Sequence, residues 1–206
     1  MSRISHIRPV HPWPLRRMHW LNAVAIVTMI GSGWQIYNAA PLFAFSFPRR
    51  FTIGEWLGAA IAWHFAAMWL LVLNGLCYLC WGALSGHFRR RFLPLSPRAV
   101  LHDLALALHL RLTHRAGTYN AVQRLLYLGV LALGVLVVAS GLAIWKPVQL
   151  AWLTDLFGGF AAARYVHFVA MTGIALFVVV HLALVAVVPK VLWPMIRGGR
   201  VEEIVQ

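Results

Sequence analysis

The sequence predicts an all-α membrane protein, a four-helix transmembrane bundle with both termini on the cytoplasmic side. Of its 206 residues, 61% are hydrophobic and 11% are charged, whereas soluble domains carry about 25% charged residues. Four apolar windows each reach the roughly 20 residues that a helix needs to cross a bilayer. The positive charges are concentrated in the two ends of the chain and in the connection between the second and third windows.

The four windows define the expected spans in chain order. They cover about residues 18–38, 53–84, 125–145 and 165–188. The second window is longer than a membrane requires, so we expect it to tilt or to extend into the cytoplasm. No low-complexity linker separates two independent cores, and residues 1–206 are therefore expected to form a single domain.

The distribution of positive charge predicts the orientation of the spans. A net charge of +13 in a soluble protein would suggest nucleic acid, but no aromatic residues interleave with a basic groove here. Of the 18 Lys and Arg residues, only Arg49, Arg50, Lys146 and Arg164 lie in the first and third connections. The other 14 lie in the termini and the central connection, which are placed inside because cytoplasmic loops are enriched in Lys and Arg.

Three features outside this frame have simple interpretations. The first window lacks a small-residue cleavage site, so it is expected to remain as a signal anchor. Residues 98–112 mix leucines with polar side chains and are expected to form an interfacial helix on the inner leaflet. Cys77 and Cys80 form a CxxC late in the second window, where buried thiols are more typical than a zinc or redox site.

Four histidines, His19, His64, His167 and His181, lie within the long apolar segments. Ionisable side chains are costly in hydrocarbon, so each indicates a functional site with a partner. His167 and His181 are 14 positions apart in one segment. On an α-helix this spacing places them on the same face, about 21 Å apart along the axis.

The predicted topology pairs these histidines by depth. Spans one and three run outward, while spans two and four run inward. His19 and His181 then lie near the cytoplasmic surface, and His64 and His167 lie in the outer half of the membrane. Two imidazoles at each of two depths are typical of two bis-histidine haems, whose saturated iron is suited to electron transfer.

Three features resemble the cytochrome b561 superfamily of di-haem subunits, including those of nickel–iron hydrogenases and respiratory formate dehydrogenase. They are Arg17-Met18-His19-Trp20, Trp63-His64 and the spacing of His167 and His181. The likeness covers about residues 10–195, and in particular it is to stand-alone cytochromes that serve periplasmic molybdopterin oxidoreductases. It implies a multi-pass protein of the bacterial inner membrane that binds two haem b groups.

A further segment, Tyr119-Asn120-Ala121-Val122-Gln123-Arg124, is similar to the YNAGQK segment of the formate dehydrogenase cytochrome. The resemblance implies that Asn120, with Tyr119 and Gln123 beside it, contacts ubiquinone or menaquinone. Val122 replaces the glycine of that segment, which puts the neighbouring backbone contact in doubt. From the residues alone, Asn120 is equally suited to be the N-cap of the third span.

Two sets of residues have both a structural and a cofactor-related interpretation. Arg17, near the expected inner haem, and Arg164, near the outer one, suit haem propionates, or they are ordinary membrane-flanking charges. Small residues within the spans permit close helix packing, or they make room for a flat macrocycle. These small residues are Gly31, Gly33, Gly129, Gly134, Ser140, Gly141 and Gly173.

The predicted function is electron transfer across the membrane between the quinone pool and a periplasmic redox partner, expected to be a molybdopterin oxidoreductase. The chain alone is expected to have no substrate chemistry. One alternative is a self-contained oxidoreductase, such as a superoxide:quinone oxidoreductase, with Arg49, Arg50, Lys146 and Arg164 forming a cationic funnel. The other is a haem-free transporter or membrane anchor in which the histidines relay protons.

Overall fold

The computed structural model describes residues 5–8, 11–92, 96–108, 120–199 and 201–204. Within these ranges the chain is almost entirely helical, as predicted, and two short strands lie at its ends. The elements are β1 (Ser5–Arg8), α1 (Trp13–Ala39), η1 (Arg49–Phe51), α2 (Leu57–Leu84), α3 (His87–Phe92), α4 (Pro97–Leu108), α5 (Ala121–Trp145), α6 (Ala151–Leu156), α7 (Phe160–Val187), η2 (Pro189–Val191), α8 (Leu192–Arg197) and β2 (Val201–Ile204).

Four long helices match the four predicted spans within a few residues at either end. In the described part of the chain, three of them are long and apolar enough to cross a membrane, namely α2, α5 and α7. Helix α1 has 27 residues, which is also sufficient length. Its amides Asn22, Gln35 and Asn38 make it less apolar than the other three.

The residues group into two compact units, and each long helix contributes to both. Unit 1 comprises Met1–Arg17, Leu79–Leu131 and Val179–Gln206. Unit 2 comprises Met18–Tyr78 and Ala132–Val178. His64 and His167 both belong to unit 2, so the geometry between them can be described directly.

Unit 2 is held together by small side chains between helices and by a short helix that the sequence did not predict. One buried cluster joins Val137 of α5 to Ala170 and Ile174 of α7. Between these helices, α6 folds back at their shared end, where the Thr154 hydroxyl donates to the Ala143 carbonyl at 3.1 Å. This bond satisfies a carbonyl in the last turn of α5.

The glycine pair after α6 allows the chain to turn into α7. Gly158 and Gly159 have φ angles of 85° and 98°. Side chains with a Cβ atom rarely adopt this left-handed region, so glycine is the residue that fits there. The pair therefore sets the point at which α7 begins and the direction in which it leaves α6.

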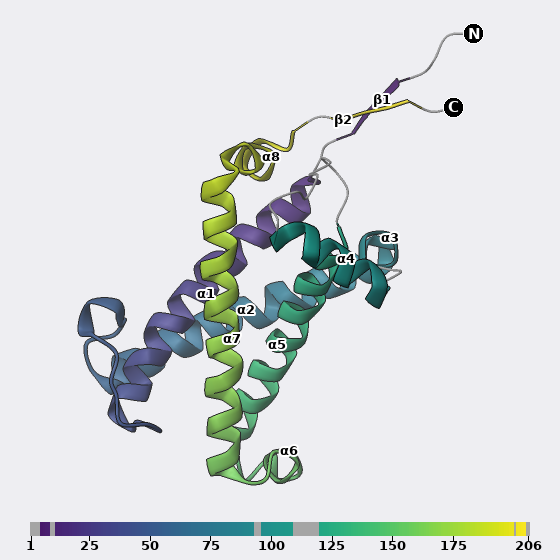
Figure 1. Ribbon diagram of the computed structural model, residues 1–206. Coiled ribbons are helices and arrows are strands. Elements are labelled where there is room, and N and C mark those ends of the chain that lie inside the picture. Colours follow the sequence, from purple (N-terminus) through teal and green to yellow (C-terminus); the bar gives the residue numbers. More distant parts are fainter. Residues whose placement is uncertain (1–4, 9–10, 93–95, 109–119, 200, 205–206) are drawn as a thin grey trace. The chain divides into compact units, whose positions relative to one another are not determined.

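Unit 1 contains a contact between the two ends of the chain that the sequence did not predict. Strands β1 and β2 pair antiparallel, with Ser5 opposite Ile204 and Arg8 opposite Val201 (Figure 1). The Arg16 guanidinium also donates to the Ile196 carbonyl at 2.7 Å. The start of α1 is thus bonded to the end of α8.

Helix α4, Pro97–Leu108, covers most of the segment 98–112 that was expected to form an interfacial helix, and its position at the membrane surface stays a prediction. Residues 109–112 lie outside the described residues. Leu101 and Leu104 of α4 are exposed, at 68% and 44%. This apolar surface is consistent with a helix that lies against lipid.

A pair of amides links α1 to α2 inside unit 2. The Asn74 amide nitrogen donates to the Asn22 side-chain oxygen and to the Met18 carbonyl, both at 2.7 Å. Asn74 is only 8% exposed. Buried polar groups in a bundle stabilise the fold only when they are paired, so this contact selects one arrangement of the two helices.

Replacing Asn74 should therefore weaken the α1–α2 contact. We expect Asn74→Ala to lower the free energy of unfolding by about 1 kcal/mol, because two acceptors lose their donor. The measurement is sodium dodecyl sulfate-induced unfolding in detergent followed by circular dichroism. The control is Leu73→Ala, since the Leu73 side chain is 57% exposed. Equal unfolding curves for both variants would contradict the role given to Asn74.

Candidate functional site

The structure brings the rings of His64 of α2 and His167 of α7 close together in unit 2. Their ring centroids lie 6.5 Å apart, and the ring planes are inclined at 65°. At this separation of the ring centroids the two rings do not stack on each other, and they are too far apart for a direct hydrogen bond between them. A group of the right size between them would contact both.

Each of the two imidazoles is held by a serine from a neighbouring helix. The Ser32 hydroxyl of α1 lies 3.1 Å from His64 Nδ1. The Ser140 hydroxyl of α5 lies 3.2 Å from His167 Nδ1. Both serines are completely buried, with 0% exposure. Neither histidine therefore depends on solvent for its Nδ1 hydrogen bond.

The backbone around each serine fixes the direction of these bonds. The Ser32 hydroxyl donates to the Thr28 carbonyl at 2.6 Å, and the Ser140 hydroxyl donates to the Leu136 carbonyl at 2.7 Å. A hydroxyl has one proton, and the shorter bond to the carbonyl uses it. The serine oxygen must then accept from the imidazole, so Nδ1 carries the proton. The other ring nitrogen, Nε2, is left with an unprotonated lone pair suited to a metal.

A glycine follows each serine and leaves room for the histidine ring. A Cβ atom added at Gly33 would lie 3.4 Å from His64 Cε1, and one added at Gly141 would lie 3.2 Å from His167 Cε1. Both distances are at or below ordinary van der Waals contact. The rings consequently lie against helix backbone, and a side chain at either glycine would displace them.

The site is thus built from the same arrangement twice. In each case a Ser-Gly dipeptide on one helix faces a histidine on the next long helix, α1 with α2 and α5 with α7. The sequence analysis identified the glycines and Ser140 only as small residues and did not single out Ser32. The recurrence of Ser-Gly inside two predicted spans was the signal that could have identified the serines.

The spacing of the two rings fits an ion bound between them. Metal–imidazole nitrogen bonds are about 2 Å long, as in zinc sites, and each ring centre lies about 1 Å beyond its nitrogen, which gives a centroid separation of about 6 Å. The observed 6.5 Å agrees with this value. The protonated Nδ1 positions also match the usual pattern, in which a metal-binding histidine donates its other N–H to a fixed acceptor.

An aromatic cluster closes the end of unit 2 near these histidines. Phe168 of α7 lies 5.1 Å from Tyr37 and 5.4 Å from Phe43, measured between ring centroids. Tyr37 is buried, at 7% exposure, and its hydroxyl exchanges hydrogen bonds with the backbone of Phe43. The loop after α1 is therefore fixed onto α7.

The other predicted pair, His19 and His181, is divided between the units. His19 belongs to unit 2, where its ring packs edge-on against Trp20 at 5.4 Å. His181 belongs to unit 1. His181 and His167 lie on one uninterrupted helix, α7. The prediction that they share a helix face assumed such a helix. The pairing of His19 with His181 stays a prediction.

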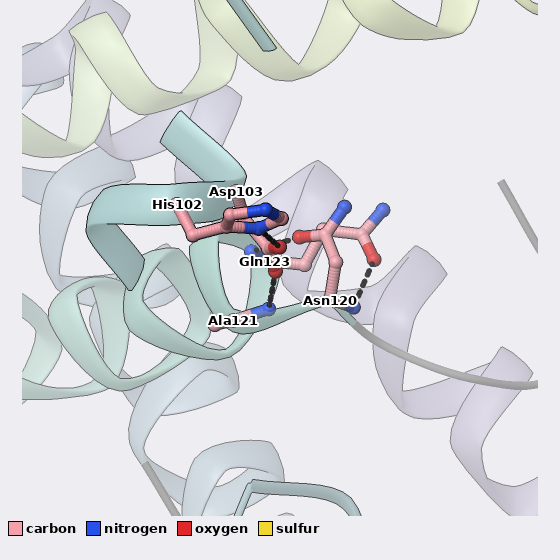
Figure 2. Close-up of polar contacts among 5 residues, drawn as sticks. All are labelled: His102, Asp103, Asn120, Ala121 and Gln123. Carbon is pink, nitrogen blue, oxygen red and sulfur yellow. Dashed lines mark hydrogen bonds and ion pairs between the residues drawn. The ribbon is translucent and has the colours of Figure 1, made fainter. Parts of the chain in front are cut away.

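Asn120 and Gln123 form a reciprocal cap at the start of α5. The Gln123 N–H donates to the Asn120 side-chain oxygen at 2.8 Å, and the Asn120 N–H donates to the Gln123 side-chain oxygen at 3.1 Å. Asp103 of α4 accepts from the Ala121 N–H at 2.8 Å (Figure 2). This is a capping box, in which two free amide donors of the first turn are satisfied. Tyr119 lies outside the described residues.

The cap uses only the oxygens of the two amides. In Figure 2 the side-chain nitrogens of Asn120 and Gln123 are directed away from the dashed bonds. Each amide nitrogen carries two protons that it can donate. The capping role considered for Asn120 is therefore present, and it leaves donors that a second partner could accept.

The two arginines expected near propionates both have contacts within their own units. The Arg17 guanidinium lies 4.9 Å from the centre of the Trp13 ring, a cation–π geometry. The Arg164 guanidinium donates to the Ala40 carbonyl and so links α7 to the end of α1. An arginine has five donors, and the bond to Ala40 within the described part of the chain uses one of those of Arg164.

Comparison with known proteins decides the family. The family described as prokaryotic cytochrome b561 matches residues 10–198. The chain belongs to this family. The resemblance noted from the sequence is thereby confirmed, and the protein is a membrane cytochrome that binds b-type haem and acts in electron transfer.

Two relatives of this cytochrome carry descriptive names. A protein of Azospira oryzae named "Putative protein-methionine-sulfoxide reductase subunit YedZ1" is 50% identical over 195 residues, which cover 94% of this chain and 98% of the relative. A protein of Bradyrhizobium diazoefficiens named "Probable Ni/Fe-hydrogenase B-type cytochrome subunit" is 24% identical over 190 residues, covering 84% of this chain and 75% of the relative. Both relatives are named as subunits of redox enzymes.

The two glycines beside the histidine rings provide a test of the site. We expect Gly141→Ala to reduce the haem content of the purified cytochrome more than Gly33→Ala, because its Cβ would come closer to the ring, and overpacking of this kind costs about 1–3 kcal/mol. The measurement is the ratio of haem absorbance to protein. Gly129→Ala is the control, since a Cβ there would meet none of the described atoms within 4 Å. Equal haem content in all three variants would show that the rings have no need of these glycines.

Proposed function

We propose that this chain is a four-span, di-haem cytochrome b that carries electrons across the bacterial inner membrane. Its electron donor is the quinone pool, and its acceptor is a periplasmic reductase. The observation that carries the proposal is the pair His64 and His167. Their ring centroids lie 6.5 Å apart, and each Nδ1 is hydrogen-bonded to the hydroxyl of a buried serine. Family membership supplies the type of cofactor, and this pair supplies residues that fit it.

In this proposal the outer haem is held by the free Nε2 atoms of His64 and His167. An iron porphyrin with two imidazole ligands exchanges single electrons and has no open position for oxygen or substrate. The serines keep the imidazoles in the required tautomer. The ring contacts of Phe168 with Tyr37 and Phe43 hold the loop after α1 against α7, the helix that carries His167.

A second haem is proposed between His19 and His181, near the cytoplasmic surface. The spacing of 14 residues between His167 and His181 on α7 supports it, because the two side chains share one helix face at different depths. In this arrangement α7 supplies one ligand to each haem. Arg17 and Arg164 are the proposed partners of the propionates, since a guanidinium binds a carboxylate with two parallel bonds.

The four-span topology rests on the length of α1 and on the distribution of charge. Helix α1 is as long as the three apolar helices to within two residues, and 14 of the 18 Lys and Arg residues lie in the termini and the central connection. These segments are proposed to be cytoplasmic. The first and third connections, with Arg49, Arg50, Lys146 and Arg164, would then face the periplasm.

The quinone is proposed to bind at the start of α5. The side-chain nitrogens of Asn120 and Gln123 can donate to a quinone carbonyl while their oxygens remain in the cap. Tyr119, next to them in the chain, supplies a hydroxyl that could donate as well. Ubiquinone and menaquinone both have the carbonyl oxygens that this arrangement would recognise.

The name of the Azospira oryzae relative supports a specific electron acceptor. We propose a periplasmic enzyme that reduces methionine sulfoxide in proteins, of the molybdopterin class expected from the sequence. Reducing one sulfoxide to a thioether and water consumes two electrons and two protons. One quinol releases two electrons and two protons on oxidation. Electrons would therefore flow outward, from the quinone site past the inner pair of histidines to the outer pair.

The proposal predicts the haem content of histidine variants. We expect a pyridine haemochrome assay to give two haems per chain in the parent and one in His64→Ala, His167→Ala or His181→Ala, because each variant would lack one of the two histidines that would hold a haem. The control is His102→Ala, since the His102 side chain is 72% exposed. A parent without haem, or full haem content in His64→Ala, would refute the proposed ligation.

Variants of Asn120 separate a cap from a quinone contact. Asn120→Asp and Asn120→Ser keep an N-cap oxygen but lose the amide donor. We expect both to keep the parent's stability and to slow haem reduction by a short-chain quinol at least tenfold, measured by stopped flow. Asn120→Ala should also destabilise the protein by about 1 kcal/mol. Parent-like rates in the Asp and Ser variants would limit Asn120 to the cap.

A further inference from the structure

We infer that Ser32 and Ser140 are positioning residues that lower the reduction potential of the outer haem by acting on its two ligands. The inference rests on the proposed function, since it requires haem between His64 and His167. The two serine side chains contact the imidazoles, and they would contact neither the iron nor a substrate.

The two serine–histidine contacts have nearly the same geometry. The serine oxygens lie 3.1 and 3.2 Å from Nδ1, and both serines are 0% exposed. Each hydroxyl also lies 3.3 Å from a second carbonyl, that of Met29 or Val137, three residues before it. The single hydroxyl proton is thus held among helix carbonyls in both cases, and the oxygen is left to accept. The same serine–histidine geometry therefore occurs on two different helices, α1 and α5.

An acceptor at Nδ1 changes the electronic character of the ligand. When Nδ1–H donates a hydrogen bond, electron density shifts toward the ring, and Nε2 becomes a stronger donor to the metal. A stronger donor stabilises ferric iron more than ferrous iron and so lowers the reduction potential. The effect is not diluted by water, because the serines are buried and hydrogen bonds strengthen in an apolar interior.

The chain offers matched controls for these serines. Thr28 of α1 and Thr172 of α7 also donate to the carbonyl four residues earlier, at 2.9 and 2.8 Å. Among the residues that the structure describes, neither threonine is bonded to an imidazole. Replacing each threonine by valine removes a helix-bonded hydroxyl of the same kind and keeps the shape of the side chain.

The experiment is a spectroelectrochemical titration of the holoprotein in detergent. The outer transition is the one that is absent in His64→Ala. We expect Ser32→Ala and Ser140→Ala each to change the equilibrium constant of this one-electron reduction about threefold. At 59 mV per tenfold change, this raises the reduction potential by about 28 mV. The double variant should show about a tenfold change, or about 59 mV, because the serines act on different ligands. Thr28→Val and Thr172→Val should titrate like the parent.

Cysteine variants keep the inference testable if an alanine variant loses its haem. Cysteine has nearly the size of serine, and its sulfur is a weak acceptor. Ser32→Cys and Ser140→Cys should therefore retain haem and shift the outer potential upward by a smaller amount. A shift in the inner transition, or no shift beyond that of the threonine controls, would overturn the inference.

The failure of this inference can be distinguished from that of the proposed function. If the parent contains haem and His64→Ala loses one, but the serine variants titrate like the parent, only the role of the serines is wrong. If His64→Ala retains the parent's haem and both transitions, the proposed ligation fails, and the serine inference fails with it.

Discussion

The geometry of unit 2 depends on one constraint, the single proton of a buried serine hydroxyl. Helix carbonyls four residues earlier bind this proton at Ser32 and at Ser140. Each oxygen can then only accept, and the facing imidazole is held in one tautomer and one orientation. A polar ring inside an apolar bundle would otherwise cost several kcal/mol, so this bond both stabilises the histidine and prepares it as a ligand.

The rest of unit 2 keeps these two contacts in register. Gly33 and Gly141 let the rings approach the backbone, and Asn74 ties α2 to α1. Helix α6 and the Gly158-Gly159 turn connect α5 to α7. A histidine and its serine always come from different helices, so a slip of one helix would break the contact. The orientation of the two imidazoles therefore depends directly on how the helices pack.

Much of the helical framework could be predicted from composition and charge, because apolar windows of this length have few alternatives in a membrane. The four histidines could be selected for the same reason: a polar ring in hydrocarbon is conspicuous. The serines are harder to select, because a hydroxyl that bonds its own helix is common in apolar helices, and only the repeated Ser-Gly dipeptide sets Ser32 and Ser140 apart. Helix α6 and the β1–β2 pair were also missed, since four to six residues are too short to show a hydrophobic pattern.

The pairing of β1 with β2 brings two segments from opposite ends of the described sequence together. Ser5 lies opposite Ile204, so the first and last described residues are neighbours although they are farthest apart along the chain. A short flexible linker could join them with little further loss of entropy. New ends could then be opened in another connection, which would change the order of the helices along the chain while leaving the contacts between them available.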